Sequence, residues 1–78
     1  MYTIYTQDMC GYCTMAKKLM VDHNIEFVEI NINYDSQARD LIKNLGFKTV
    51  PQIYDDHSNH IGGYTDLLEI YDKNDGTD

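Results

Sequence analysis

Two cysteines three positions apart are the residues of this chain best suited to carry chemistry. They stand in the segment Cys10-Gly11-Tyr12-Cys13, and the 78-residue sequence contains no other cysteine. Thiols at this spacing can exchange with disulfides or can supply two ligands to a zinc ion, whereas a bridge between them closes too short a loop to stabilise a fold much. The histidines that could complete a zinc site form no tight ligand pair: His23, His57 and His60. We therefore predict redox chemistry and expect no obligatory metal.

Thiol–disulfide exchange requires a thiolate at neutral pH, so the site must lower the pKa of one sulfur. A helix N-terminus does this because its unpaired amides and partial positive charge stabilise an anion. Apolar residues at helical spacing follow the pair, and His23-Asn24 supplies a stop: Met15, Ala16, Leu19 and Met20. We predict that Cys10 lies at the mouth of this helix as the nucleophile, with Cys13 one turn inside as the resolving thiol.

The other elements are predicted from the same kinds of pattern. Alternating residues over 2–6 and 26–32 favour two strands, which are parallel if the helix between them is a crossover. A second helix starts at Asp35 or Ser36, ends at Gly46 and places these residues on one face: Ala38, Leu41, Ile42 and Leu45. Short strands at 52–54 and 60–61 form a hairpin, and after Gly62-Gly63 a last helix opens with Thr65, Asp66 and Glu69.

The order β-α-β-α-β-β-α predicts an α/β fold, a four-stranded mixed sheet flanked by helices. A chain of this length has room for one domain, which we assign to residues 1–72, and the polar residues 73–78 are expected to be a frayed tail.

Composition excludes several classes of partner. The net charge of −7 leaves six basic residues in no long run, so nucleic acid is a poor partner. The first residues lack the basic start and apolar run of a secretion signal, and no stretch is long enough to span a bilayer. We therefore expect a cytoplasmic monomer that does not bind membranes.

Four motifs together resemble the glutaredoxin family in order and spacing over nearly the whole chain. They are Tyr5-Thr6, Cys10-Gly11-Tyr12-Cys13, Thr49-Val50-Pro51, and Gly62-Gly63 followed by Asp66. The resemblance implies a thioredoxin-like fold and a glutathione-dependent oxidoreductase that reduces protein disulfides, such as that of ribonucleotide reductase, and glutathione mixed disulfides. It also implies a cis bond between Val50 and Pro51, whereas local sequence alone favours trans.

The resemblance further implies a set of glutathione contacts. The backbone of Val50 would pair with the tripeptide, and the amides of Thr65 and Asp66 would hold its γ-glutamyl carboxylate at a helix N-terminus. The Asp66 carboxylate would meet the amino group, although a helix cap is an alternative role for it. Tyr12 would flank the bound sulfur, although aromatic residues of this kind are more often half-buried. The expected glutathione-binding residues are Tyr12, Lys48, Thr49, Val50, Pro51, Gly63, Thr65 and Asp66.

Two positions depart from the family pattern. Gln7 stands where many relatives have a lysine for the glycine carboxylate of glutathione, so Gln7 offers only a neutral contact. Lys48, or Gln37 and Arg39 at the start of the second helix, are expected to supply the missing polarity. Gly11 stands where dithiol members usually have proline. The motif therefore begins Cys-Gly, as in the monothiol class, which binds a [2Fe–2S] cluster between two subunits. A glutathione-ligated cluster module using Cys10 is therefore the alternative function, although Cys13 favours the dithiol class.

Overall fold

The computed structural model describes residues 1–72 and confirms the predicted order of elements. The strands are β1 (Tyr2–Thr6), β2 (Phe27–Asn31), β3 (Gln52–Tyr54) and β4 (His60–Gly62). The helices are α1 (Gly11–Asp22), α2 (Ser36–Asn44) and α3 (Tyr64–Asp72). The predicted tail, residues 73–78, lies outside the described residues. No helix within residues 1–72 has the length and apolar character needed to cross a membrane.

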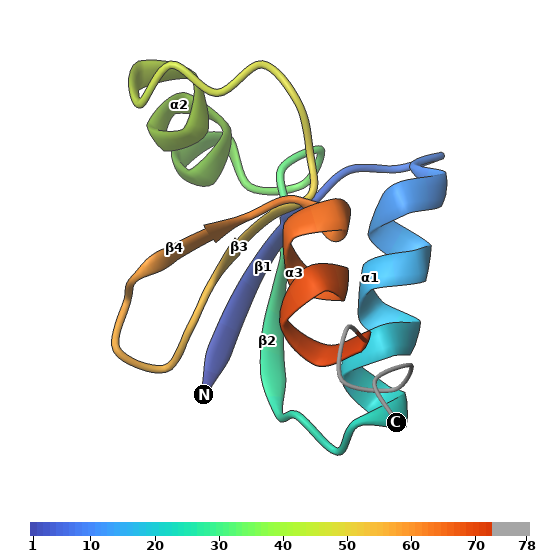
Figure 1. Cartoon of the computed structure of the whole chain (residues 1–78). Coiled ribbons are helices and arrows are strands. Elements are labelled where there is room, and N and C mark those ends of the chain that lie inside the picture. The colour runs from blue at the N-terminus through green and yellow to red at the C-terminus, as the bar shows by residue number, and fades with distance from the viewer. Residues whose placement is uncertain (73–78) are drawn as a thin grey trace.

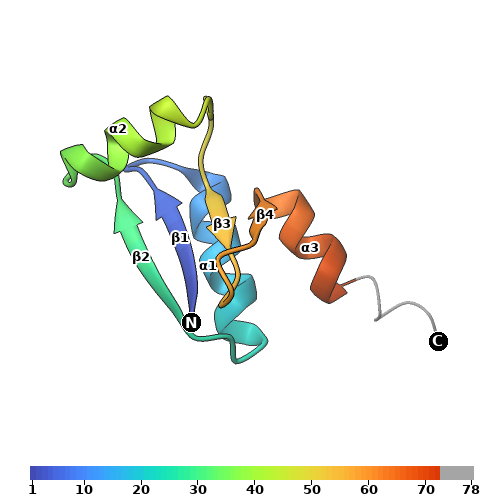
Figure 2. The same cartoon turned by 90° about the vertical axis from the view of Figure 1, so that its left-hand side faces the viewer.

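The four strands form one mixed sheet in the order β2-β1-β3-β4. β1 runs parallel to β2 and antiparallel to β3, and β3 and β4 form the antiparallel hairpin. Helices α1 and α3 lie side by side on one face of the sheet, and α2 lies beyond the ends of β1 and β2 on the other side (Figures 1 and 2). This arrangement is the predicted four-stranded α/β fold.

One small core joins the sheet to the two helices on its face. Five side chains are buried in it, from β1, α1, β3 and α3: Ile4, Ala16, Met20, Ile53 and Leu67. Ile4 pairs with Ile53 across β1 and β3, so the centre of the sheet lies directly beneath the helices. The start of α1 and the start of α3 are thereby held near the same end of the molecule (Figure 1).

Helix capping follows the sequence closely. The Asp35 carboxylate accepts a hydrogen bond from the Ala38 amide at 3.0 Å, so Asp35 rather than Ser36 caps α2. Gly46 follows the end of α2 with φ +88°, the left-handed conformation expected of a helix terminator.

The amphipathic patterns were partly wrong about burial. Met15 is 45 % exposed, and on α2 only Ala38 and Ile42 are buried while Leu41 and Leu45 are exposed. The reason is geometric: a short helix buries only the narrow stripe that faces the rest of the fold, and apolar residues beside that stripe stay exposed at its rim. In α1 the buried stripe is Cys13, Ala16 and Met20.

Candidate functional site

The two cysteines lie at the start of α1, as predicted, and are joined in a disulfide. Cys10 is the N-cap residue and its Sγ accepts a hydrogen bond from the Cys13 amide at 3.1 Å. The Cys10 carbonyl accepts the first bond of the helix, from the Thr14 amide at 3.2 Å. Cys13 is only 2 % exposed, whereas Cys10 is partly exposed. The sulfur of Cys10 therefore occupies the position where α1 offers both its free amides and an opening to solvent.

This geometry distinguishes the two thiols once the disulfide is reduced. A thiolate at Cys10 keeps the hydrogen bond from the Cys13 amide and lies at the positive end of the helix, both of which stabilise the anion. Burial of Cys13 removes it from approaching substrates but leaves it next to Cys10. The arrangement suits an attacking thiol at position 10 and a resolving thiol at position 13.

The loop before β3 brings the proline motif to Cys10. The Val50 carbonyl oxygen lies 3.7 Å from Cys10 Sγ, and the Val50–Pro51 bond is cis, as the family resemblance implied. The disulfide sulfur carries no proton, so the contact is one of van der Waals type in this state. The reduced thiol could donate to the same carbonyl.

A groove of about 250 Å³ connects these elements to the start of α3. Its lining consists of Tyr12, Thr49, Val50, Pro51, Gly63, Tyr64, Thr65 and Asp66. Seven of these eight residues were predicted from the sequence as glutathione contacts, and they come from three segments far apart in the chain.

Tyr64 is the groove residue that the sequence analysis missed. Its ring stacks on that of Tyr12, with centroids 6.0 Å apart and planes 26° from parallel. Tyr12 itself is 62 % exposed, so it departs from the half-buried state typical of aromatic residues. The sequence offered one signal for Tyr64: it is an aromatic residue directly between Gly63 and Thr65, two of the predicted contacts. A side chain at this first position of α3 lies at the edge of the groove.

Asp66 takes the capping role that the sequence left as an alternative. Its Oδ2 accepts a hydrogen bond from the Gly63 amide at 2.9 Å, and the Gly63 carbonyl accepts from the Leu67 amide at 3.1 Å, so Gly63 is the N-cap of α3. The Asp66 side chain remains exposed and lines the groove. A cap and a ligand contact are therefore compatible, because a carboxylate can accept several hydrogen bonds.

Lys48 and Gln7 lie beside the groove rather than in it. Both line an adjoining hollow of about 140 Å³ that shares Thr49 and Val50 with the groove. Arg39 and Lys43 of α2 also line this hollow. Half of the six basic residues of an acidic chain thus gather at this hollow.

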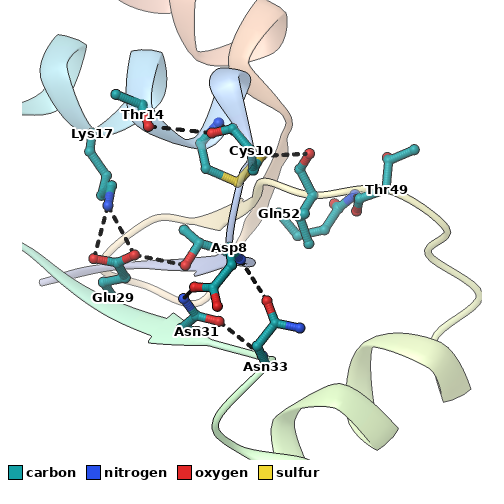
Figure 3. The surroundings of a disulfide bond; sticks show 12 residues. Asp8, Cys10, Thr14, Lys17, Glu29, Asn31, Asn33, Thr49 and Gln52 are labelled. Carbon is teal, nitrogen blue, oxygen red and sulfur yellow. Dashed lines mark hydrogen bonds and ion pairs between the residues drawn. A yellow bond between two sulfur atoms is a disulfide. The ribbon is translucent and has the colours of Figure 1, made fainter.

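A polar network lies on the other side of the cysteines (Figure 3). Lys17 of α1 forms an ion pair with Glu29 of β2 at 3.0 Å, and the buried Thr6 hydroxyl donates to Glu29 Oε2 at 2.7 Å. The Thr6 hydrogen bond, with help from Lys17, lowers the pKa of Glu29 below its ordinary value. A fixed ion pair therefore lines the hollow behind Cys10 and Cys13.

Within residues 1–72 no group of three or more His, Cys, Asp and Glu side chains could hold a metal ion. The histidines have other neighbours: His23 contacts Tyr71, His57 contacts Asp56 and His60 contacts Gln52. The [2Fe–2S] alternative requires a free Cys10 thiolate from each of two subunits, and it stays a prediction.

Comparison with known proteins gives a consistent result. The family model described as Glutaredoxin matches residues 2–60. Glutaredoxin 3 of Escherichia coli K12 is 41 % identical over 68 residues, which cover 86 % of this chain and 81 % of that protein.

Solved structures show the same likeness. The crystal structure of glutaredoxin 1 from Francisella tularensis, complexed with cacodylate, superposes with a TM-score of 0.77 at 35 % identity and covers 92 % of both chains. A buckwheat glutaredoxin–glutathione complex superposes with a TM-score of 0.79 at 25 % identity, over 94 % of this chain and 69 % of that one.

Proposed function

Because this chain belongs to the glutaredoxin family and is a thiol–disulfide oxidoreductase with Cys10 and Cys13 as its redox pair, we propose that glutathione is its reductant and the thiol bound in its groove. The observation that carries the proposal is the groove itself. A backbone segment, a helix N-terminus and a carboxylate meet there within reach of Cys10. These are the groups that a tripeptide with one amino group and two carboxylates requires.

Each part of glutathione has a partner of matching chemistry. The backbone of Val50 pairs with the extended chain of the tripeptide, as an added strand would. The free amides of Thr65 and Asp66 at the start of α3 bind the γ-glutamyl carboxylate, and the Asp66 carboxylate meets the amino group. Lys48 and Arg39 in the adjoining hollow supply positive charge for the glycine carboxylate, which Gln7 cannot provide.

The reaction on a glutathione mixed disulfide has two exchange steps. The Cys10 thiolate attacks the glutathione sulfur, the bond to the substrate breaks, and the substrate leaves as a thiolate. A second glutathione thiolate then attacks the sulfur of the bound glutathione, releasing glutathione disulfide and the Cys10 thiolate. Cys13 takes no part in this route.

The reaction on a protein disulfide uses both cysteines. Cys10 attacks one protein sulfur, and the other leaves as a thiolate. Cys13 then attacks Cys10, which forms the Cys10–Cys13 disulfide and frees the second protein thiolate. Two glutathione molecules return the pair to dithiols and become glutathione disulfide. We propose that the chain acts in this way as a cytoplasmic monomer, on disulfide-containing proteins such as ribonucleotide reductase.

The assignment of the two thiols is tested by Cys10→Ser and Cys13→Ser. Cys10→Ser should abolish all activity, whereas Cys13→Ser should keep deglutathionylation and lose most reduction of intramolecular protein disulfides. A glutathione-coupled assay on a small mixed disulfide and an insulin-reduction assay measure the two activities. If Cys13→Ser abolishes both, Cys13 is not merely the resolving thiol and the assignment is wrong.

Glutathione recognition is tested by replacing Asp66 with Asn, which removes the charge while its side-chain oxygen can still cap Gly63. The expected loss is about 1 kcal/mol, or roughly fivefold in kcat/KM for glutathione, because the contact is charge-assisted but exposed. Glu69→Gln removes the same charge elsewhere on α3 and should leave kcat/KM for glutathione unchanged. Equal kinetics for Asp66→Asn and Glu69→Gln would remove Asp66 from the site. Wild-type activity that depends on thioredoxin reductase rather than glutathione would contradict the whole proposal.

A further inference from the structure

A buried glutamine lies directly after the proline motif. Gln52, the first residue of β3, is 6 % exposed, and both ends of its side-chain amide are hydrogen-bonded. Its Nε2 donates to the Thr49 carbonyl oxygen at 2.9 Å, and its Oε1 lies 2.7 Å from His60 Nε2. The side chain therefore links the proline motif to β4.

These contacts determine which atoms carry the protons. The Thr49 carbonyl can only accept, so the glutamine NH₂ group must face it and the glutamine oxygen must face His60. His60 Nε2 must then carry a hydrogen and donate it. That N–H is present both in the neutral Nε2–H tautomer and in the protonated ring, so the link does not depend on the charge of His60.

The ring of His60 is held by aromatic neighbours even though the residue is exposed. Its centroid lies 4.7 Å from that of Phe47, with the planes 28° apart, and 5.0 Å from that of Tyr54. Phe47 also lines the basic hollow beside the groove. The Nε2–H group of His60 that faces Gln52 is therefore held in place by Phe47 of the loop before β3 and by Tyr54 of β3.

The segment that receives this support has little else to hold it. Lys48, Thr49 and Val50 precede β3, and pairing of β3 with β1 begins only at Gln52. In the part of the chain that the structure describes, no backbone-to-backbone hydrogen bond outside the helices and strands involves these three residues. The Gln52 amide is thus the polar contact that fixes the Thr49 carbonyl, one peptide before the Val50 carbonyl that faces Cys10.

We propose that His60 is a positioning residue of this oxidoreductase, acting through Gln52 to hold the Thr49–Pro51 wall of the groove at the distance from Cys10 that a bound thiol tripeptide requires. The proposal rests on the proposed function for the identity of that tripeptide. His60 acts on binding rather than on the sulfur chemistry, because neither it nor Gln52 lines the groove or the hollow next to the cysteines.

The decisive variant is His60→Phe, which keeps an aromatic ring beside Phe47 and Tyr54 but has no N–H to donate. Its matched control is His57→Phe in the same hairpin, where the histidine is exposed and its side chain lies 3.9 Å from the Asp56 carboxylate. His60→Phe should raise KM for glutathione about three- to tenfold, the effect of one net hydrogen bond, with kcat nearly unchanged. His57→Phe should leave both constants at wild-type values.

Three further measurements separate positioning from a loss of structure. The urea midpoint of His60→Phe should fall by no more than the loss of one buried hydrogen bond explains, so that the variant stays fully folded in the assay. The rate at which iodoacetamide alkylates Cys10 should stay at its wild-type value, while the amide NMR signals of Thr49 and Val50 should shift. Gln52→Leu should raise KM in the same way and add nothing to His60→Phe in the double variant. If Gln52→Leu does not fold, the KM of His60→Phe alone tests the positioning role.

Two results would overturn the inference. One is a His60→Phe enzyme whose KM matches that of His57→Phe. The other is a loss of activity in His60→Phe that matches the fraction of the variant unfolded under the assay conditions, since that would make His60 merely structural. Failure of the proposed function is a different observation, because the wild-type protein would then show no glutathione-driven reduction at all.

Discussion

Replacing Gly62 with Ala should destabilise the protein far more than the same change at its neighbour Gly63. Gly62 has φ +124°, a conformation that residues with a side chain rarely adopt. A Cβ built there would overlap the carboxylate of Asp66, the group that caps Gly63. At Gly63 φ lies outside the left-handed region, and a Cβ would meet only the Pro51 carbonyl oxygen at an ordinary 3.5 Å.

The magnitude follows from two costs. The backbone conformation alone costs an alanine about 1–3 kcal/mol. Displacing Asp66 loses a helix cap, which costs about 1 kcal/mol more. The total for Gly62→Ala is about 2–4 kcal/mol, a large part of the roughly 4–12 kcal/mol expected for a domain of this size. Gly63→Ala should cost less than about 1 kcal/mol, because alanine is only a poorer N-cap than glycine.

Urea denaturation followed by far-UV circular dichroism measures the difference. With a urea dependence of about 1 kcal/mol per molar, the two midpoints should lie roughly 1–4 M apart. Adding Asp66→Ala to Gly62→Ala should cost less than the sum of the single changes, because it removes the carboxylate that the new methyl group displaces. Equal midpoints for the two glycine variants, or strict additivity in the double variant, would refute the role assigned to Gly62.

Three other predictions concern the core and the polar contacts of β1. Ile53→Ala should lower the free energy of unfolding by about 2–5 kcal/mol in urea titrations, because Ile53 is fully buried at the centre of the sheet. The Thr6 hydrogen bond lowers the pKa of Glu29 below its ordinary 4.5. The stability that ionised Glu29 contributes is therefore fully present above pH 4.5 and is lost as the pH falls through the lower pKa of the folded state. Thr6→Val should therefore lose more stability at pH 6 than at pH 3, as urea midpoints at the two pH values would show. The hydrogen bond with Tyr71 raises the pKa of Tyr2 to about 12. The stability that this hydrogen bond contributes is therefore fully present below pH 10 and is lost as the pH rises towards 12. Tyr2→Phe should remove a tyrosine transition near pH 12 from the absorbance titration at 295 nm.

Local sequence predicted the elements because the signals that specify them act over a few residues. Capping by Asp35, termination at Gly46 and the stop after residue 22 depend on neighbours within one turn. The alternation over residues 2–6 likewise marks a strand with one buried face. The same locality explains the redox pair, since Cys10 at a helix mouth and Cys13 one turn inside follow from their spacing and from the helical pattern of the residues after them.

Local sequence did not predict which apolar residues at the edge of the core are buried. The pattern along the first helix counted Met15 with Met20, but Met20 is fully buried and Met15 lies in a hollow beside Tyr64 and Leu68. Which apolar residue meets the sheet depends on how the helix is rotated against it. Sequence periodicity specifies that rotation only to within about one residue.

The sequence by itself determined the order of elements, the α/β class and the reactive pair, and family motifs added most residues of the groove. The tertiary structure decided that three distant segments share one groove, that Tyr64 stacks on Tyr12, and that Asp66 caps its own helix while facing the groove. It also decided that His60 and Gln52 support the Thr49 carbonyl. The physical reason is that helices, caps and turns form from contacts within a few residues, whereas the groove and its supports exist only after β3 pairs with β1 and β4 and α3 packs against α1.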